Sequence, residues 1–303
     1  MSINYNNDNT IIFTLARMNP PTPGHLYLIQ RLIQEAINKN VSQIFVILSK
    51  SNDDNENPIS CPEKINILGD ADDITKTMIL SLKEKMINET SDSMLKDKIH
   101  NMKVNTICVP EQKGATPFTP LIPIIGSMRD NNINDINLFL IIGDDRKNML
   151  DSITDFFFKW ENVNSVSGEI LAREEMTEFK EKSKDPVQLD KLIMSDVPAN
   201  AMSASFVRNI VKNKRRDKFT ELYSPYLEKD KIPVLYESIL KGIQTLPPNT
   251  KNDTPLKPLK YSYPMIKGIS EFPIKSVSKK RGGKKTRRKY KKTRKHKKYT
   301  KRK

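Results

Sequence analysis

A hydroxyl, a glycine and an imidazole lie within four residues near the start of the chain, in the stretch Thr22-Pro23-Gly24-His25. Thr22 is a favourable N-cap residue and Pro23 suits the first helical position, so a helix should begin at about Gly24. The free backbone N–H groups of a helix start attract phosphate, and His25 can donate a ring N–H to the same anion. Gly24 would let the ligand approach the backbone closely. The stretch therefore predicts a phosphate-binding site.

The elements that would position this stretch are those of a parallel sheet. Residues 11–16 (IIFTLA) and 43–49 (QIFVILS) are short apolar runs rich in β-branched and aromatic residues, which is typical of strands covered on both faces. Between them, apolar residues recur at helical spacing at Leu26, Ile29, Ile33, Ala36 and Ile37. This order predicts a β-α-β unit with a right-handed crossover.

Further buried strands are expected at residues 104–109 and 136–143, and a weaker one at 165–171. The polar stretch from about 71 to 100 is expected to be helical and to lie outside the sheet. The pattern predicts an α/β fold, a Rossmann-like parallel sheet with helices on both faces, followed by C-terminal helices. In such a sheet ligands bind outside the carboxyl ends of the strands, and the connection that holds residues 22–25 borders that crevice.

With its flanking residues, the first stretch (19–25, NPPTPGH) resembles the T/HxGH signature of the nucleotidyltransferase superfamily of adenylyl- and cytidylyltransferases. Residues 203–208 (SASFVR) are similar to that family's second signature, S-x-S/T-x-x-R at the start of a late helix. Residues 141–146 (IIGDDR) resemble the G-x-D that ends the fourth strand, and residues 57–64 (NPISCPEK) resemble a stretch of phage-encoded members. The resemblance spans roughly residues 11–240.

The resemblance implies transfer of AMP or CMP from a nucleoside triphosphate to a phosphorylated small-molecule acceptor, with release of pyrophosphate. The acceptor phosphate is already an anion, so catalysis would consist of positioning and charge stabilisation. The implied catalytic residues are His25 and Thr22, which would hold the developing charge on the α-phosphate, and Arg208, which would neutralise the leaving pyrophosphate. Thr22 replaces the first histidine of the HxGH form, and Ala16 stands where many members have glycine.

The resemblance also implies a set of nucleotide-binding residues. Ser203, Ser205 and the N–H groups of the late helix would hold the β- and γ-phosphates. Lys64 and Arg146 would be additional phosphate contacts, and Asp144 would face the ribose or the acceptor. Mg²⁺ would bridge the phosphates, coordinated by water and substrate with no protein ligand. The full implied nucleotide-binding set is Pro23, Gly24, Ser203, Ser205, Asp144, Arg146 and Lys64.

Each stretch also has a purely structural interpretation. Residues 19–25 could form only a stiff corner with a surface histidine, Ser203 an ordinary helix cap, Arg208 a solvated residue, and GDDR a polar exit from the sheet. Two signatures in the expected order favour the functional interpretation. The threonine of the first signature and the GDD stretch mildly favour nicotinamide mononucleotide as the acceptor, and cytidylyl transfer to a phospho-alcohol is the nearest alternative.

The chain has two cysteines, Cys61 and Cys108, with 46 residues between them. This small number supports neither a disulfide framework nor a Cys-rich zinc site and favours a reducing compartment. The first ten residues lack the features of a secretory signal, and no apolar run is long enough to cross a bilayer. We therefore expect a soluble intracellular protein without a membrane partner.

The chain of 303 residues carries 52 Lys and Arg and 36 Asp and Glu, but 17 of the basic residues lie in 279–303, so the remainder is close to neutral. We expect a nucleotidyltransferase domain in 1–245, a linker in 246–278 and a disordered basic tail in 279–303. The tail could bind nucleic acid or another polyanion. The alternative function is therefore a catalytically inactive member of the family that binds nucleic acid or is packaged in a virion through this tail. Such tails resemble those of proteins of large DNA viruses, which would place the protein in the host cytoplasm or nucleus, or in the virion.

Overall fold

The computed structural model describes residues 9–52, 54–70, 75–112, 114–143, 146–172 and 177–247. Asp144, nearly all of the expected linker and the whole expected tail lie outside the described residues. Within the described residues, no helix is both long and apolar enough to span a bilayer.

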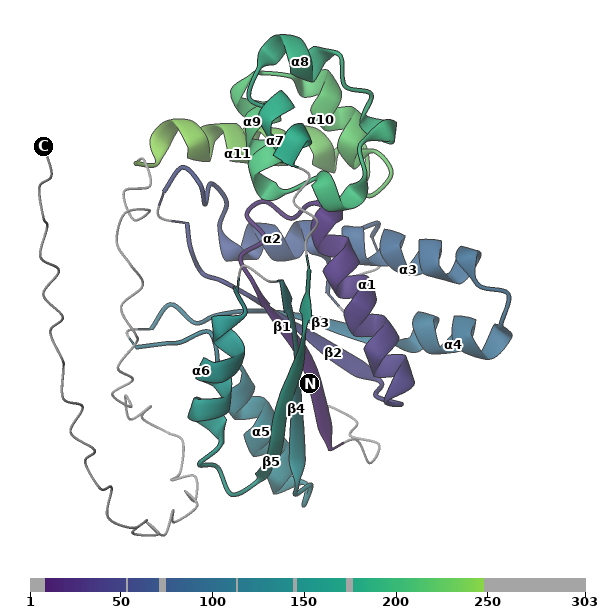
Figure 1. Cartoon of the computed structure of the whole chain (residues 1–303), viewed down its shortest axis with the longest axis vertical. Helices are drawn as coiled ribbons and strands as arrows, with labels where there is room; N and C mark the ends of the chain where they lie inside the picture. Colours follow the sequence, from purple (N-terminus) through teal and green to yellow (C-terminus); the bar gives the residue numbers. More distant parts are fainter. Residues whose placement is uncertain are drawn as a thin grey trace, which may run out of the picture.

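The centre of the fold is a five-stranded parallel sheet in the order β3-β2-β1-β4-β5 (Figure 1). The strands are β1 (Thr10–Ala16), β2 (Gln43–Leu48), β3 (Lys103–Cys108), β4 (Ile136–Gly143) and β5 (Val163–Leu171). The four buried strands and the weaker fifth are present where the apolar runs predict them. The expected Rossmann-like α/β fold is confirmed.

Helices cover both faces of the sheet because the strand side chains alternate between two hydrophobic cores. In β1, Ile12 and Ala16 belong to the core on one face, and Ile11, Phe13 and Leu15 to the core on the other. The helices of the first face are α1 (Pro23–Asn38), α3 (Met78–Glu89) and α4 (Ser93–Asn101), and those of the second are α5 (Leu121–Asp130) and α6 (Asn148–Phe157). The helical stretch expected at 71–100 contains two helices, α3 and α4, which pack against α1.

A group of helical segments follows the sheet and continues the first core through buried side chains such as Phe206 and Tyr223. Figure 1 shows the group at one end of the sheet, close to the start of α1. Its members are α7 (Thr177–Lys182), α8 (Pro186–Asp190), η2 (Met194–Asp196), η3 (Ala199–Ala201), α9 (Ala204–Lys212), α10 (Arg216–Tyr223) and α11 (Lys231–Thr245).

The carboxyl ends of three strands lie in register. Ala16 of β1 pairs with Leu48 of β2, and Leu48 pairs with Cys108 of β3. The residues that follow these strands are therefore gathered at one edge of the sheet, where the predicted site should be. A short helix, α2 (Cys61–Leu68), also lies beside this edge.

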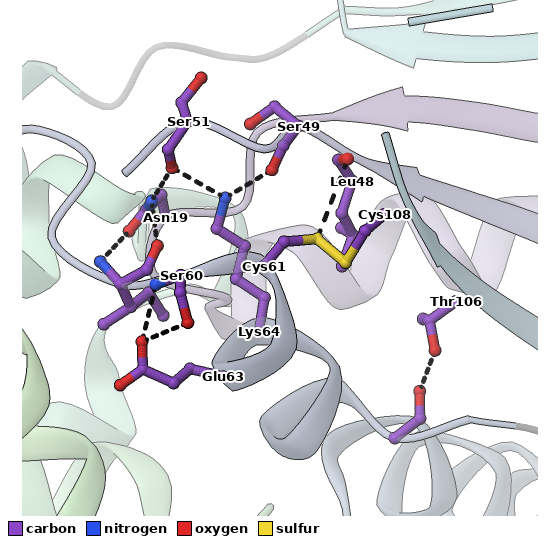
Figure 2. Close-up of a disulfide and its surroundings, with 12 residues drawn as sticks. Asn19, Leu48, Ser49, Ser51, Ser60, Cys61, Glu63, Lys64, Thr106 and Cys108 are labelled. Atoms are coloured by element: carbon purple, nitrogen blue, oxygen red, sulfur yellow. Dashed lines mark hydrogen bonds between the residues drawn. A yellow bond between two sulfur atoms is a disulfide. The ribbon is translucent and has the colours of Figure 1, made fainter. Parts of the chain in front are cut away.

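The two cysteines are disulfide-bonded, although their small number does not predict a disulfide framework. Cys61, at the first position of α2, forms a disulfide with Cys108, and their Cα atoms are 5.9 Å apart (Figure 2). A single pair with a long separation does not resemble the dense cysteine framework of small secreted domains. The fold nevertheless brings both residues to the carboxyl edge of the sheet. The compartment of the protein stays a prediction.

Candidate functional site at the carboxyl edge of the sheet

The corner between β1 and α1 is held by a buried asparagine. Asn19 is 1% exposed, and its Nδ2 donates hydrogen bonds to the carbonyl oxygens of Ser51 (3.0 Å) and Ile59 (2.9 Å). Its Oδ1 accepts a hydrogen bond from the Ile59 N–H at 3.1 Å. A side-chain amide has both a donor and an acceptor end, so one residue satisfies three backbone groups. The corner is thereby joined to the chain that follows β2.

Helix α1 begins at Pro23 with Thr22 as its N-cap, as the sequence predicts. The Thr22 N–H donates to Nδ1 of His25 at 3.0 Å, and the Thr22 hydroxyl lies 2.9 Å from the same nitrogen. Because a backbone N–H can only donate, Nδ1 is an acceptor and the proton of the neutral ring is on Nε2. The helix cap therefore fixes the tautomer that offers an Nε2–H donor. His25 is 8% exposed, so the interpretation as a surface histidine is wrong.

The second signature forms the start of α9. Ser203 is the N-cap, and its Oγ accepts a hydrogen bond from the Phe206 N–H at 3.2 Å, so the expectation of helix capping is confirmed. Arg208 is only partly exposed. Its Nη2 donates to Oγ of Ser205 at 3.2 Å, and its Nη1 donates to the carbonyl oxygen of Asn19 at 2.7 Å. Two stretches 189 residues apart are thus in direct contact.

Two more contacts bring the starts of α1 and α9 together. The Tyr223 hydroxyl donates to the carbonyl oxygen of Pro21 at 2.6 Å, and burial raises the pKa of this phenol, which keeps it protonated as a donor. A Cβ atom at Gly24 would lie 3.0 Å from the carbonyl oxygen of Ala199 and 3.1 Å from that of Met202. Glycine at position 24 thus allows the chain before α9 to pack on α1. On the side of α1 that faces these two carbonyl groups, the missing side chain makes room for protein backbone and not for the expected ligand.

Three cations gather where the strands end. Arg17 directly follows β1, Lys64 lies on α2, and Arg146 follows β4. Nζ of Lys64 donates to the carbonyl oxygens of Ser49 (2.9 Å) and Ser51 (3.4 Å), as Figure 2 shows. Burial, and then repulsion from Arg17 and Arg146, lowers the pKa of the Lys64 ammonium to about 8. Lys64 is therefore a buried positive charge that is repelled by two other positive charges, those of Arg17 and Arg146.

Arg208 belongs to the same electrostatic environment. Burial lowers the pKa of its guanidinium, the carboxylates of Glu56 and Asp54 raise it, and Arg17 lowers it. Arg17 thus acts on both Lys64 and Arg208. We call these four residues, Arg17, Lys64, Arg146 and Arg208, the basic cluster. An anion placed within it would relieve the repulsion between its members.

The structure brings together most of the residues that the sequence predicts. Thr22, Pro23, Gly24 and His25 start α1, Ser203, Ser205 and Arg208 start α9, and Lys64 and Arg146 join them at the sheet edge. Arg17, Asn19 and Tyr223 were missed. The position of Arg17 could have been predicted from the sequence, because a residue that directly follows a predicted parallel strand lies at the ligand-binding edge of the sheet.

Two surface hollows of the described residues lie elsewhere. They are found at the far end of α1, around Asn40 and Asn101 and around Gln34 and Met86, and none of the predicted site residues lines them. The candidate site is therefore defined by the donors and charges of its described residues.

A magnesium ion at this site would depend on the substrate. Among the described residues there is no group of three His, Cys, Asp or Glu side chains that could hold a metal ion. Mg²⁺ often keeps several water ligands and is bound largely through substrate phosphates. The donor set fits an ion that arrives with a triphosphate, while the basic side chains bind the phosphate oxygens that the ion leaves free.

We expect anion binding at this edge to weaken as the pH rises above about 8. A bound phosphate favours the charged form of Lys64 and raises its pKa, so binding above pH 8 takes up a proton. The affinity should then fall by up to about tenfold per pH unit. Calorimetry with inorganic tripolyphosphate between about pH 7.5 and 9.5 measures this. In Lys64→Arg, whose charge does not titrate in this range, the decline should be absent; the same decline in both proteins would contradict the assignment to Lys64.

Comparison of the sequence with protein-family models and with curated proteins found no match. The geometry and the two signatures are therefore the basis for a functional proposal.

Proposed function

We propose that the protein is a nucleotidyltransferase that transfers AMP or CMP from a nucleoside triphosphate to a phosphorylated small molecule and releases pyrophosphate. The observation that carries the proposal is the contact between the two signatures, in which Arg208 of α9 donates to the carbonyl oxygen of Asn19 beside the start of α1. Two helix starts and four cations at one edge of a parallel sheet suit a chain of phosphates.

Each group would act through charge and position. The Nε2–H of His25 and the Gly24 N–H at the start of α1 would bind the α-phosphate, where charge develops during attack by the acceptor. The N–H groups at the start of α9, with the Ser205 hydroxyl, would bind the β- and γ-phosphates, and Arg208 would neutralise the leaving pyrophosphate. Mg²⁺, when bound with the triphosphate, would supply further neutralisation of phosphate charge.

Arg17 adds a positive charge that the resemblance does not imply. It repels the Lys64 ammonium, and so does Arg146, so three positive charges act on one another at the sheet edge. A triphosphate together with an acceptor phosphate brings more negative charge than two helix starts and one arginine would balance. We propose that the basic cluster binds this additional phosphate charge, which fits a phosphorylated acceptor better than an uncharged one.

A panel of reactions tests the proposal. Pyrophosphate release is measured with each of four nucleoside triphosphates and Mg²⁺, against nicotinamide mononucleotide, phosphopantetheine, phosphocholine and glycerol 3-phosphate. We expect release that depends on one triphosphate and one acceptor, with nicotinamide mononucleotide and ATP as the first pair to test. The matched control is Lys212→Ala, at the opposite end of α9 from Ser203, which should leave the rate unchanged.

The alternative, a catalytically inactive protein that binds nucleic acid, depends on residues 279–303. Two results together would favour it. No pyrophosphate release would be detected with any pair in the panel, and DNA binding would fall steeply with salt and be lost when residues 279–303 are deleted. The same deletion should leave pyrophosphate release unchanged if the transferase proposal is right.

A further inference from the structure

The Cys61–Cys108 disulfide joins two elements that border the proposed site. Cys61 is the first residue of α2, and Cys108 is the last residue of β3, in register with Leu48 of β2. The sulfur of Cys61 lies 4.0 Å from the carbonyl oxygen of Leu48, directly before Ser49. The disulfide thus fastens the start of α2 against the edge of the sheet at which β2 ends (Figure 2).

Lys64 depends on this attachment for its position. It lies one helical turn after Cys61, so the two side chains share a face of α2, and Figure 2 shows both reaching toward the end of β2. The Lys64 ammonium is buried, it is repelled by Arg17 and Arg146, and its hydrogen bonds are to the carbonyl oxygens of Ser49 and Ser51. Repulsion of this kind pushes the start of α2 away from the sheet, and the covalent bond opposes it.

The other end of α2 is attached independently of the cysteines. The Thr106 N–H donates to Asp70 Oδ1 at 2.9 Å, and the Thr106 hydroxyl donates to the carbonyl oxygen of Gly69 at 2.7 Å. Gly69, the C-cap of α2, has a φ of +95°, which glycine adopts without strain. Loss of the disulfide would therefore loosen the start of the helix, with Lys64, while its end stays on β3. The non-covalent contacts left at the start include the hydrogen bonds between Asn19 and Ile59 and those from Lys64 to Ser49 and Ser51, which the repulsion by Arg17 and Arg146 opposes.

The two sulfur atoms differ in their surroundings. Cys61 is 5% exposed, whereas Cys108 is partly exposed and is therefore the more accessible residue of the pair. Cys61 lies at a helix start, one turn from the Lys64 ammonium, and both features favour negative charge on its sulfur. An incoming thiolate should therefore attack Cys108, and the electron pair of the broken S–S bond should leave on Cys61.

We propose that Cys61–Cys108 is a thiol–disulfide exchange site that controls anion binding through the position of Lys64. A dithiol reductant attacks Cys108 Sγ, the S–S bond breaks, and Cys61 leaves as a thiolate. The second thiolate of the reductant then attacks the mixed disulfide, releases Cys108 as a thiolate and leaves the reductant as a disulfide, a transfer of two electrons. The oxidised protein has Lys64 held in the basic cluster, and the reduced protein has it released. The inference rests on the anion-binding part of the proposed function.

The test compares the two redox states of the full chain. Alkylation and intact mass should give no modified cysteine before treatment with dithiothreitol and two afterwards, and trapping with glutathione should give the mixed disulfide at Cys108. Calorimetry with inorganic pyrophosphate should show about tenfold weaker binding to the reduced protein, the loss of one charge-assisted contact. Lys64→Met is the control: its binding should be weak and equal in both states. Cys108→Ser should bind as the reduced protein does.

The possible failures are distinguishable. Equal, tight binding in both redox states, together with weaker binding by Lys64→Met, would overturn the redox inference and leave the proposed function standing. Binding of pyrophosphate in neither state would contradict the anion site itself. Two free thiols in the untreated protein, or complete loss of helical circular dichroism on reduction, would also overturn the inference, because the disulfide would then be absent or would only hold the fold together.

Discussion

Replacement of His25 by alanine is expected to lower the rate of nucleotidyl transfer by about 10² to 10³, the usual cost of removing one donor from a developing charge. The expectation depends on the tautomer. Because the Thr22 N–H donates to Nδ1, the neutral ring carries its proton on Nε2, where it can be donated to a phosphate oxygen. The measurement is the single-turnover rate with the triphosphate and acceptor that the panel identifies.

Two variants separate chemistry from helix capping at this position. In His25→Asn the amide oxygen can replace Nδ1 as the acceptor for the Thr22 N–H, but the side chain has no donor where Nε2 lies. We expect wild-type stability and a rate as low as that of His25→Ala. A normal rate in His25→Asn would mean that the histidine only caps α1. His100→Ala, an exposed histidine on α4, is the matched control and should change nothing.

Replacement of Asn19 by alanine is expected to lower the free energy of unfolding by about 3 kcal/mol, because three hydrogen bonds disappear and the backbone groups of Ile59 lose their partner in a buried setting. The loss should be measurable as a shift in the urea midpoint. The same variant should also weaken triphosphate binding, since Asn19 joins the corner to the chain that leads into α2.

A second asparagine provides the comparison. Asn105 is half-buried on β3 and donates one hydrogen bond, to the carbonyl oxygen of Ile44 at 3.2 Å. Asn105→Ala should cost about 1 kcal/mol and leave triphosphate binding unchanged. If the two variants lost equal stability, the three contacts of Asn19 would not be what holds the corner.

The sheet could be predicted from the sequence because its signal is local. Strands β1 and β2 lie in nearly continuous apolar runs, and a strand buried on both faces needs no alternation to be recognised. The start of α1 was equally predictable, since Thr22 is a preferred N-cap residue and Pro23 is a preferred residue at the first helical position. The strand order and the alignment of the strand ends are set by pairing between distant segments, and no single segment encodes them.

The candidate site was predictable only in part. The signatures named both helix starts, but the hydrogen bond from Arg208 to Asn19 and that from Tyr223 to Pro21 are long-range contacts with no pattern in the sequence. The packing role of Gly24 could not be predicted for the same reason, because the neighbouring carbonyl groups of Ala199 and Met202 are distant in the chain. The disulfide was missed because spacing alone does not say which strand end borders α2.

The contacts of Asn19 and Pro21 with residues 189 and 202 positions later also govern how the protein matures on the ribosome. The first corner is synthesised early, but Arg208 and Tyr223, which complete it, follow only after all five strands have been made. A nascent chain that stops before α9 would contain α1 and all five strands and yet would have only half of the proposed site. The proposed site would therefore be complete only once α9 and α10 had been made.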